Sequence, residues 1–162
     1  MDFALTEEQE KLQKLVHVFV EKEVVPAARE LDERGEFPAE LFQRCGALGL
    51  FGLRYPESVG GSGGDFVSFC LMAEQIARGS LSLAAAVAMQ GLMGTDFIYR
   101  FGSEEQRIRL LAPALRGEKL GTIAMTEPDF GSDLGGITTR ATRDGSGWVL
   151  TGRKMWITSA TA

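Results

Sequence analysis

Histidine and cysteine are scarce in this chain of 162 residues, and each shortage argues against a class of function. His17 is the single histidine, which argues against a zinc site and against a Ser-His-Asp triad, so we expect no metal. The two cysteines, Cys45 and Cys70, both lie in apolar, helix-like patterns. We predict that both are buried thiols in a reducing compartment, because this pattern is not that of a disulfide framework.

The chain also lacks an excess of basic charge, a targeting signal and a long apolar run. Acidic residues outnumber basic residues by 22 to 17, which argues against nucleic acid as a partner. The N-terminal residues match neither a signal peptide nor a transit peptide. The most apolar stretch, residues 81–93, is too short to span a bilayer. We therefore expect a buried helix there, no membrane insertion and a cytoplasmic location.

The first two-thirds of the chain carry the signals that begin and end helices. Apolar residues repeat every three or four positions after each of four predicted caps. The caps are Thr6 with Gln9, Asp65, Ser80, and Ser103 with Gln106. Pro26 is expected to kink or stop the first helix, Pro38 to begin the second and Gly117 to end the last. The inward face expected after Asp65 contains Phe66, Phe69, Cys70, Ala73, Ile76 and Ala77.

After Gly117 the pattern changes to short β-branched runs separated by turns. Strands are predicted over residues 122–126, 137–142, 148–151 and 154–158, with a hairpin loop at 144–147. The predicted fold class is therefore α+β. An N-terminal all-α helical bundle domain, residues 1–117, precedes the opening strands of a β-barrel-like or β-sandwich middle domain, residues 118–162. Because these strands are too few to close a β core, we expect the chain to be part of a longer protein.

Two candidate sites are weak on local grounds. Residues 60–64 are rich in glycine but lack the Gly-Lys-Ser/Thr ending of a P-loop and the Rossmann glycine spacing. A flexible connector is favoured there over a phosphate cradle. His17 lies among apolar neighbours on a predicted helix, which favours a packed or surface histidine over a catalytic one.

Residues 125–133 are more informative. A predicted strand ends at Thr126, Pro128 turns the chain, and Gly131 lets the backbone approach a ligand closely. Ser132 adds a hydroxyl donor, and consecutive N–H groups in such a turn form an anion-binding nest.

A second candidate segment lies near Trp156. Strand alternation would place Trp156 and Thr158 on one face, where an aromatic plane beside a hydroxyl suits a flat heteroaromatic ligand. On spacing alone, a plain β-turn and a half-buried strand are favoured over a ligand site for both segments.

Residues 124–136, Ala-Met-Thr-Glu-Pro-Asp-Phe-Gly-Ser-Asp-Leu-Gly-Gly, resemble the first signature of the acyl-CoA dehydrogenase family. Four other segments resemble the family in the same order along the chain. They are Phe3-x-Leu5-Thr6-Glu7-Glu8-Gln9, Pro56-Glu57-x-x-Gly60-Gly61-x-Gly63-Gly64-Asp65, Phe101-Gly102-Ser103-Glu104-Glu105-Gln106 and Gly152-x-Lys154-x-Trp156-Ile157-Thr158. The resemblance thus covers the whole chain.

The resemblance implies a helical domain, a middle β domain and a C-terminal four-helix domain, of which this chain would hold the first and the beginning of the second. It implies FAD as cofactor and oxidation of an acyl thioester to its α,β-enoyl form. A glutamate takes the α-proton while flavin N5 receives the β-hydride, and an electron-transferring flavoprotein accepts the electrons. That glutamate is expected in the absent C-terminal part, so the chain alone is expected to be inactive, and Glu127 is given a structural role. Homo-oligomers, commonly tetramers or dimers, are also implied.

The same resemblance implies eight cofactor contacts. They are Ile123, Met125, Thr126, Gly131, Ser132, Trp156, Ile157 and Thr158. Thr126 and its neighbours would line the pyrimidine edge of the flavin, where donors stabilise developing negative charge. Ser132 would contact the pyrophosphate and also the thioester substrate, and Thr158 would hydrogen-bond near N5. Trp156 would pack on the flavin face away from substrate, and Phe130 stands where the family has a small residue.

Two other functions stay open on the sequence. One is a dehydrogenase that acts on acyl carrier-protein thioesters in a biosynthetic pathway. The other is a non-catalytic or truncated homologue that serves as an interaction module and keeps only the helical surface.

Overall fold

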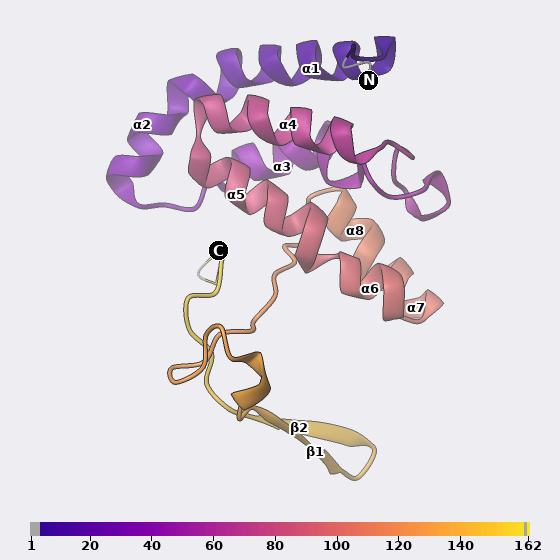
Figure 1. Ribbon diagram of the computed structural model, residues 1–162, viewed down its shortest axis with the longest axis vertical. Helices are drawn as coiled ribbons and strands as arrows, with labels where there is room; N and C mark the ends of the chain where they lie inside the picture. The colour runs from indigo at the N-terminus through magenta and orange to yellow at the C-terminus, as the bar shows by residue number, and fades with distance from the viewer. Residues whose placement is uncertain (1–3, 161) are drawn as a thin grey trace.

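The computed structural model describes residues 4–160 and 162 (Figure 1). Phe3, quoted above as part of the opening motif, lies outside the described residues. Helices occupy the first part of the chain, and an extended segment then leads away from them to a β-hairpin (Figure 1). The predicted class, a helical domain followed by antiparallel strands, is confirmed.

The first helix continues through its proline. α1 (Glu7–Phe19) begins at the predicted capping box, with Thr6 Oγ1 accepting from the Gln9 amide and the Gln9 side chain accepting from the Thr6 amide. A π-helical turn, Val20–Val24, connects it to α2 (Val25–Arg34), so Pro26 lies in the first turn of α2. The wider turn accommodates the proline ring, which would otherwise clash with the carbonyl four residues earlier. Gly35, with φ 63°, ends α2.

Three helices enclose the hydrophobic core with α1. They are α3 (Ala39–Ala47), α4 (Phe66–Gly79) and α5 (Leu81–Met89). The predicted caps form: Asp65 Oδ1 accepts from the Ser68 amide at 2.7 Å, and Ser80 Oγ accepts from the Leu83 amide at 3.2 Å. The core includes Val16, Phe19, Phe42, Cys45, Phe51, Phe69, Met72, Ile76, Leu83, Val87, Leu111 and Leu115.

The predicted inward face of α4 is partly wrong. Phe66 and Cys70 are exposed, whereas Leu71 and Met72 are buried. α4 is covered on two sides, by α1 and by α5, so its buried arc is wider and centred differently from a single amphipathic stripe. Cys45 is buried as predicted, and both cysteines are free.

The helix that begins at α5 is longer than the sequence suggested. α5, a π-helical turn (Gln90–Gly94) and α6 (Asp96–Phe101) together extend from Leu81 to Phe101, and these 21 residues are long and apolar enough to cross a membrane. The argument that this stretch is too short is therefore wrong. The predicted burial is confirmed in part: 39% of the apolar window is buried, and its buried residues contribute to the helical core.

The last helical turns end where the sequence predicted. α7 (Glu104–Gln106) begins at the Ser103 capping box, and a π-helical turn (Arg107–Leu111) leads to α8 (Ala112–Leu115). Gly117 follows with φ 79°, the left-handed conformation that glycine favours after a helix.

The β structure is a single hairpin within the described residues. β1 (Arg140–Asp144) pairs antiparallel with β2 (Gly147–Thr151), with Arg140 opposite Thr151. The predicted second strand therefore begins later than residue 137. The predicted strands at 122–126 and 154–158 are wrong, because neither segment has a neighbour with which it forms a regular hydrogen-bond ladder in the described part of the chain.

Candidate flavin-binding site

The structure brings the two predicted site segments side by side. Residues 122–127 run antiparallel to residues 154–158, although neither is a regular strand. The Met155 amide donates to the Thr126 carbonyl at 3.0 Å, and Thr122 Oγ1 donates to the Thr158 carbonyl at 2.8 Å. Both predicted contact sets, one around Thr126 and one around Trp156, therefore belong to one local unit.

A tight turn follows the first segment. Glu127 and Phe130 exchange two backbone hydrogen bonds, of 2.9 and 3.2 Å, with Pro128 at the second turn position, which its fixed φ suits. Beyond the turn, Gly131 and Ser132 are exposed.

The backbone after this turn offers free donors. The amides of residues 131–133 donate no hydrogen bond to any described residue, whereas the Ser132 carbonyl accepts from the Leu134 amide at 3.1 Å. Three consecutive unpaired N–H groups and a serine hydroxyl suit an anion such as a diphosphate.

Gly131 is not required by the packing of the chain itself. A Cβ added there would meet nothing within 4 Å, and its φ is not positive. At Gly136, by contrast, a Cβ would collide with the ring of Phe130. The bulky Phe130 thus packs over Gly136, and the space beside Gly131 stays open for a ligand.

Trp156 does not have the strand geometry that the sequence suggested. Its φ is 57° and that of Ser159 is 61°, so the expected alternation that would place Trp156 and Thr158 on one face does not apply. The indole is 83% exposed, which leaves its face available to a flat partner. Non-glycine residues in this backbone region are uncommon and gather at functional sites.

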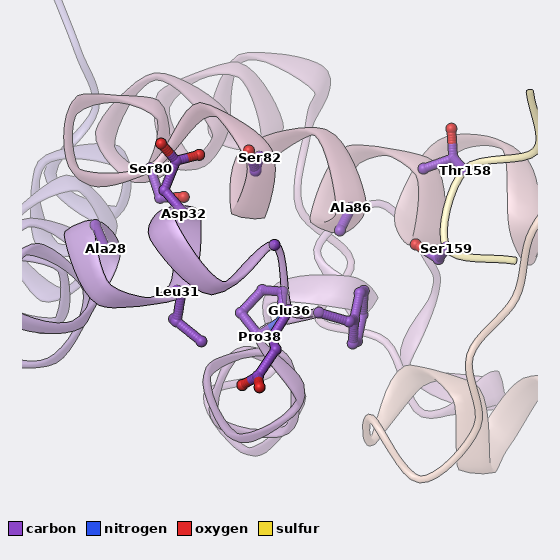
Figure 2. Close-up of a pocket in the computed structure, with 12 residues that line it drawn as sticks. Ala28, Leu31, Asp32, Glu36, Pro38, Ser80, Ser82, Ala86, Thr158 and Ser159 are labelled. Atoms are coloured by element: carbon purple, nitrogen blue, oxygen red, sulfur yellow. The ribbon is translucent and has the colours of Figure 1, made fainter. Parts of the chain in front are cut away.

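Thr158 and Ser159 reach the helical domain. They line a hollow of about 350 Å³ together with residues of α2, of the loop before α3 and of α5 (Figure 2). Asp32 lies on the α2 side of this hollow, Glu36 in the loop before α3, and Ser82 and Ala86 on the α5 side (Figure 2). No local pattern predicted this hollow, because its lining comes from three distant parts of the chain.

The Glu127 side chain makes five hydrogen bonds at the candidate site. Its side chain is 3% exposed and accepts from the amide and hydroxyl of Thr138, both at 2.7 Å, and from the amide and hydroxyl of Thr139, at 2.9 and 2.5 Å. Lys154 Nζ lies 3.0 Å from the same carboxylate.

These contacts fix the charge of Glu127. The Thr139 hydroxyl, followed by the Thr138 amide, stabilises the ionised form and holds the pKa of the carboxyl well below its usual range. A carboxylate held in this way is not free to accept a proton from a substrate, in agreement with the structural role expected for it. Sequence reasoning missed Thr138, Thr139 and Lys154 as its partners, since nothing local marks contacts across 11 to 27 residues.

The chain thus consists of a helical domain followed by an exposed turn and a β-hairpin, and comparison with known proteins identifies its family. Residues 6–118 match the model of the acyl-CoA dehydrogenase N-terminal domain, and residues 122–162 match that of the acyl-CoA dehydrogenase middle domain. The chain belongs to the acyl-CoA dehydrogenase family.

Benzylmalonyl-CoA dehydrogenase of Aromatoleum aromaticum is 52% identical over 160 residues, which cover 99% of this chain and 42% of that relative. A chain solved in work on the electron transferring flavoprotein of Acidaminococcus fermentans superposes with a TM-score of 0.93 at 32% identity, covering 97% of this chain and 41% of that one. An acyl-CoA dehydrogenase of Bacillus anthracis complexed with FAD superposes with a TM-score of 0.90 at 37% identity, covering 97% of this chain and 27% of that one. This chain therefore spans less than half the length of these proteins.

Proposed function

We propose that this chain serves in an FAD-dependent acyl-CoA dehydrogenase that introduces an α,β double bond into an acyl thioester. The observation that supports it is the antiparallel pairing of residues 122–127 with residues 154–158, which joins the two predicted flavin-contact segments. The residues fit the cofactor chemically: an exposed indole suits the flat ring system, and free N–H groups suit the diphosphate. When bound, FAD supplies the acceptor for the hydride that leaves the β-carbon.

In this proposal, residues of this chain bind the cofactor and orient it toward the thioester. Thr126, with Ile123 and Met125, lines the pyrimidine edge. Ser132 and the Gly131 amide hold the pyrophosphate, and Ser132 also contacts the thioester.

The segment of residues 156–158 contacts the flavin ring, including the region near N5. Trp156 packs against the flavin face away from substrate, and Ile157 continues that contact. Thr158 donates a hydrogen bond near N5. We assign removal of the α-proton to a glutamate in the C-terminal part of the full-length protein, since the Glu127 carboxylate is fully occupied by its five hydrogen bonds.

The partners follow from the same proposal. We propose acyl-CoA as substrate, an electron-transferring flavoprotein as electron acceptor, a homotetrameric assembly and a cytoplasmic location. The free state of both Cys45 and Cys70 supports a reducing compartment.

The test is the visible absorption spectrum of the natural full-length protein, purified without added cofactor and then mixed with a panel of acyl-CoA thioesters. We expect a flavin spectrum that one member of the panel bleaches. A flavin that ignores every acyl-CoA but responds to acyl carrier-protein thioesters would support the biosynthetic alternative. Absence of flavin after FAD is supplied would contradict the proposal and favour a non-catalytic homologue.

A further inference from the structure

The Glu127 carboxylate joins three segments that are far apart in the sequence. Its own backbone begins the turn at residues 127–130, Thr138 and Thr139 lie just before β1, and Lys154 lies just after β2. Each of the two carboxylate oxygens accepts from both a backbone amide and a hydroxyl. This arrangement fixes the carboxylate in position and orientation.

Lys154 connects the Glu127 carboxylate to the segment that contains Trp156 and Thr158. Its ammonium lies 3.0 Å from Glu127 Oε1 and 2.9 Å from the Met125 carbonyl, and its side chain is 22% exposed. The following residue, Met155, donates its amide to Thr126. The ammonium thus contacts the residues on both sides of Thr126, and its own chain continues directly into Trp156.

The Glu127 carboxylate and the Lys154 ammonium each compensate the cost of burying the other. A carboxylate that is 3% exposed and a lysine that is largely covered are each costly to bury alone, and removal of one partner leaves the other uncompensated. Loss of either charge is therefore expected to disturb the contact between the two segments more than an exposed ion pair would.

We propose that Glu127 and Lys154 are a positioning pair that holds the Thr126 segment against the Trp156–Thr158 segment, so that both meet one cofactor. The role of the pair in cofactor binding rests on the proposed function. The pair itself touches no reacting atom and acts through the backbone of Thr126 and Met155.

Hydrogen–deuterium exchange on the protein without cofactor tests the positioning directly. In Glu127→Gln and in Lys154→Met, exchange of the Met155 amide should quicken by about tenfold or more, because interaction energies within one network commonly reach this size. Amides of α4 should keep their wild-type rates, and Lys154→Arg should retain most of the protection. Glu118→Gln is the matched control, since it breaks the exposed pair with Arg116. Unchanged exchange at Met155 in both charge variants would overturn the inference.

FAD affinity of the full-length protein then tests the purpose of the pair. Glu127→Gln and Lys154→Met should each weaken FAD binding by about tenfold, and the double variant should be little worse than either single variant. Wild-type affinity in both single variants would overturn the inference while leaving the proposed function intact. A wild-type protein that fails to bind FAD would instead contradict the proposed function, and the exchange experiment would still decide whether the pair holds the segments. If Glu127→Gln loses its circular-dichroism signal, the comparison of Lys154→Met with Lys154→Arg decides the outcome.

Discussion

Gln90 is a buried amide that joins the helical domain to the segment that leaves it. Its side chain is fully buried, its Nε2 donates to the Ala114 and Lys119 carbonyls at 2.9 Å each, and its Oε1 accepts from the Gly121 amide at 2.6 Å. The π-helical turn of residues 90–94 begins at this residue.

Gln90→Leu should lower the free energy of unfolding by about 2–3 kcal/mol, because it leaves buried backbone groups without partners. Chemical denaturation followed by circular dichroism measures the change. Gln43→Leu, at an exposed position of α3, is the control. A loss no larger than that of the control would show that water replaces the amide without cost.

The two cysteines differ in a way that the sequence did not reveal. Burial raises the pKa of Cys45 to about 12, whereas Cys70 is exposed. In native buffer one thiol per chain should therefore react with a chromogenic disulfide reagent, and the second only after denaturant is added. Cys70→Ser should abolish the native reaction. Rapid reaction of two thiols in buffer would contradict the burial of Cys45.

At the scale of elements, helix beginnings were predictable because their signals are local. The caps at Thr6, Asp65, Ser80 and Ser103 each use a side chain within three residues of the amide it binds. Strands were less predictable, since a strand requires a partner at a distance that sequence does not specify. Residues 122–126 and 154–158 have strand-like composition, yet they meet each other through isolated hydrogen bonds.

The contact between residues 122–127 and residues 154–158 should depend on pH. The folded state holds the pKa of Glu127 far below its ordinary value of 4.5, so its contribution to stability is complete above about pH 4.5 and is lost as the pH falls toward the folded value. We expect acid to loosen the Met155 amide before it unfolds α4, and Glu127→Gln to show a flatter profile below pH 4.5. Exchange rates measured across the acid range provide the check. Identical profiles for the two proteins would contradict the assignment.

At the scale of the whole molecule, the sequence singled out the two segments of the candidate site but did not show how they are arranged. The family signature identified residues around Thr126 and Trp156, but not their antiparallel pairing or the left-handed backbone at Trp156. Contacts across the chain, such as Lys154 to Glu127, depend on tertiary structure that no local pattern encodes. Large apolar side chains on the hairpin and on α6, including Trp148, Leu150 and Phe101, are exposed.

The 162-residue chain alone should not oxidise acyl-CoA. Its one buried carboxylate at the site is saturated with donors, and the Trp156 ring is open to water. A dye-reduction assay with FAD and an acyl-CoA panel should give no turnover, whereas the natural full-length protein serves as the positive control. Turnover by the short chain would place the proton-accepting group within it.

The close approach of the backbone at Gly94 and Gly121, where the chain leaves the helical domain, limits where residues can be inserted. Gly94 and Gly121 lie so close that a Cβ on either would meet the carbonyl of the other, and Gln90 holds the same close approach. A residue inserted between positions 118 and 121 would shift this contact, even though domain boundaries are usually chosen for insertions. The exposed hairpin loop at Gly145 and Ser146 has no such contact, and Gly145 has open space around its α-carbon. A fluorescent label or affinity tag inserted in this loop should leave the thermal midpoint of the helical domain unchanged, whereas the same insertion between positions 118 and 121 should lower it.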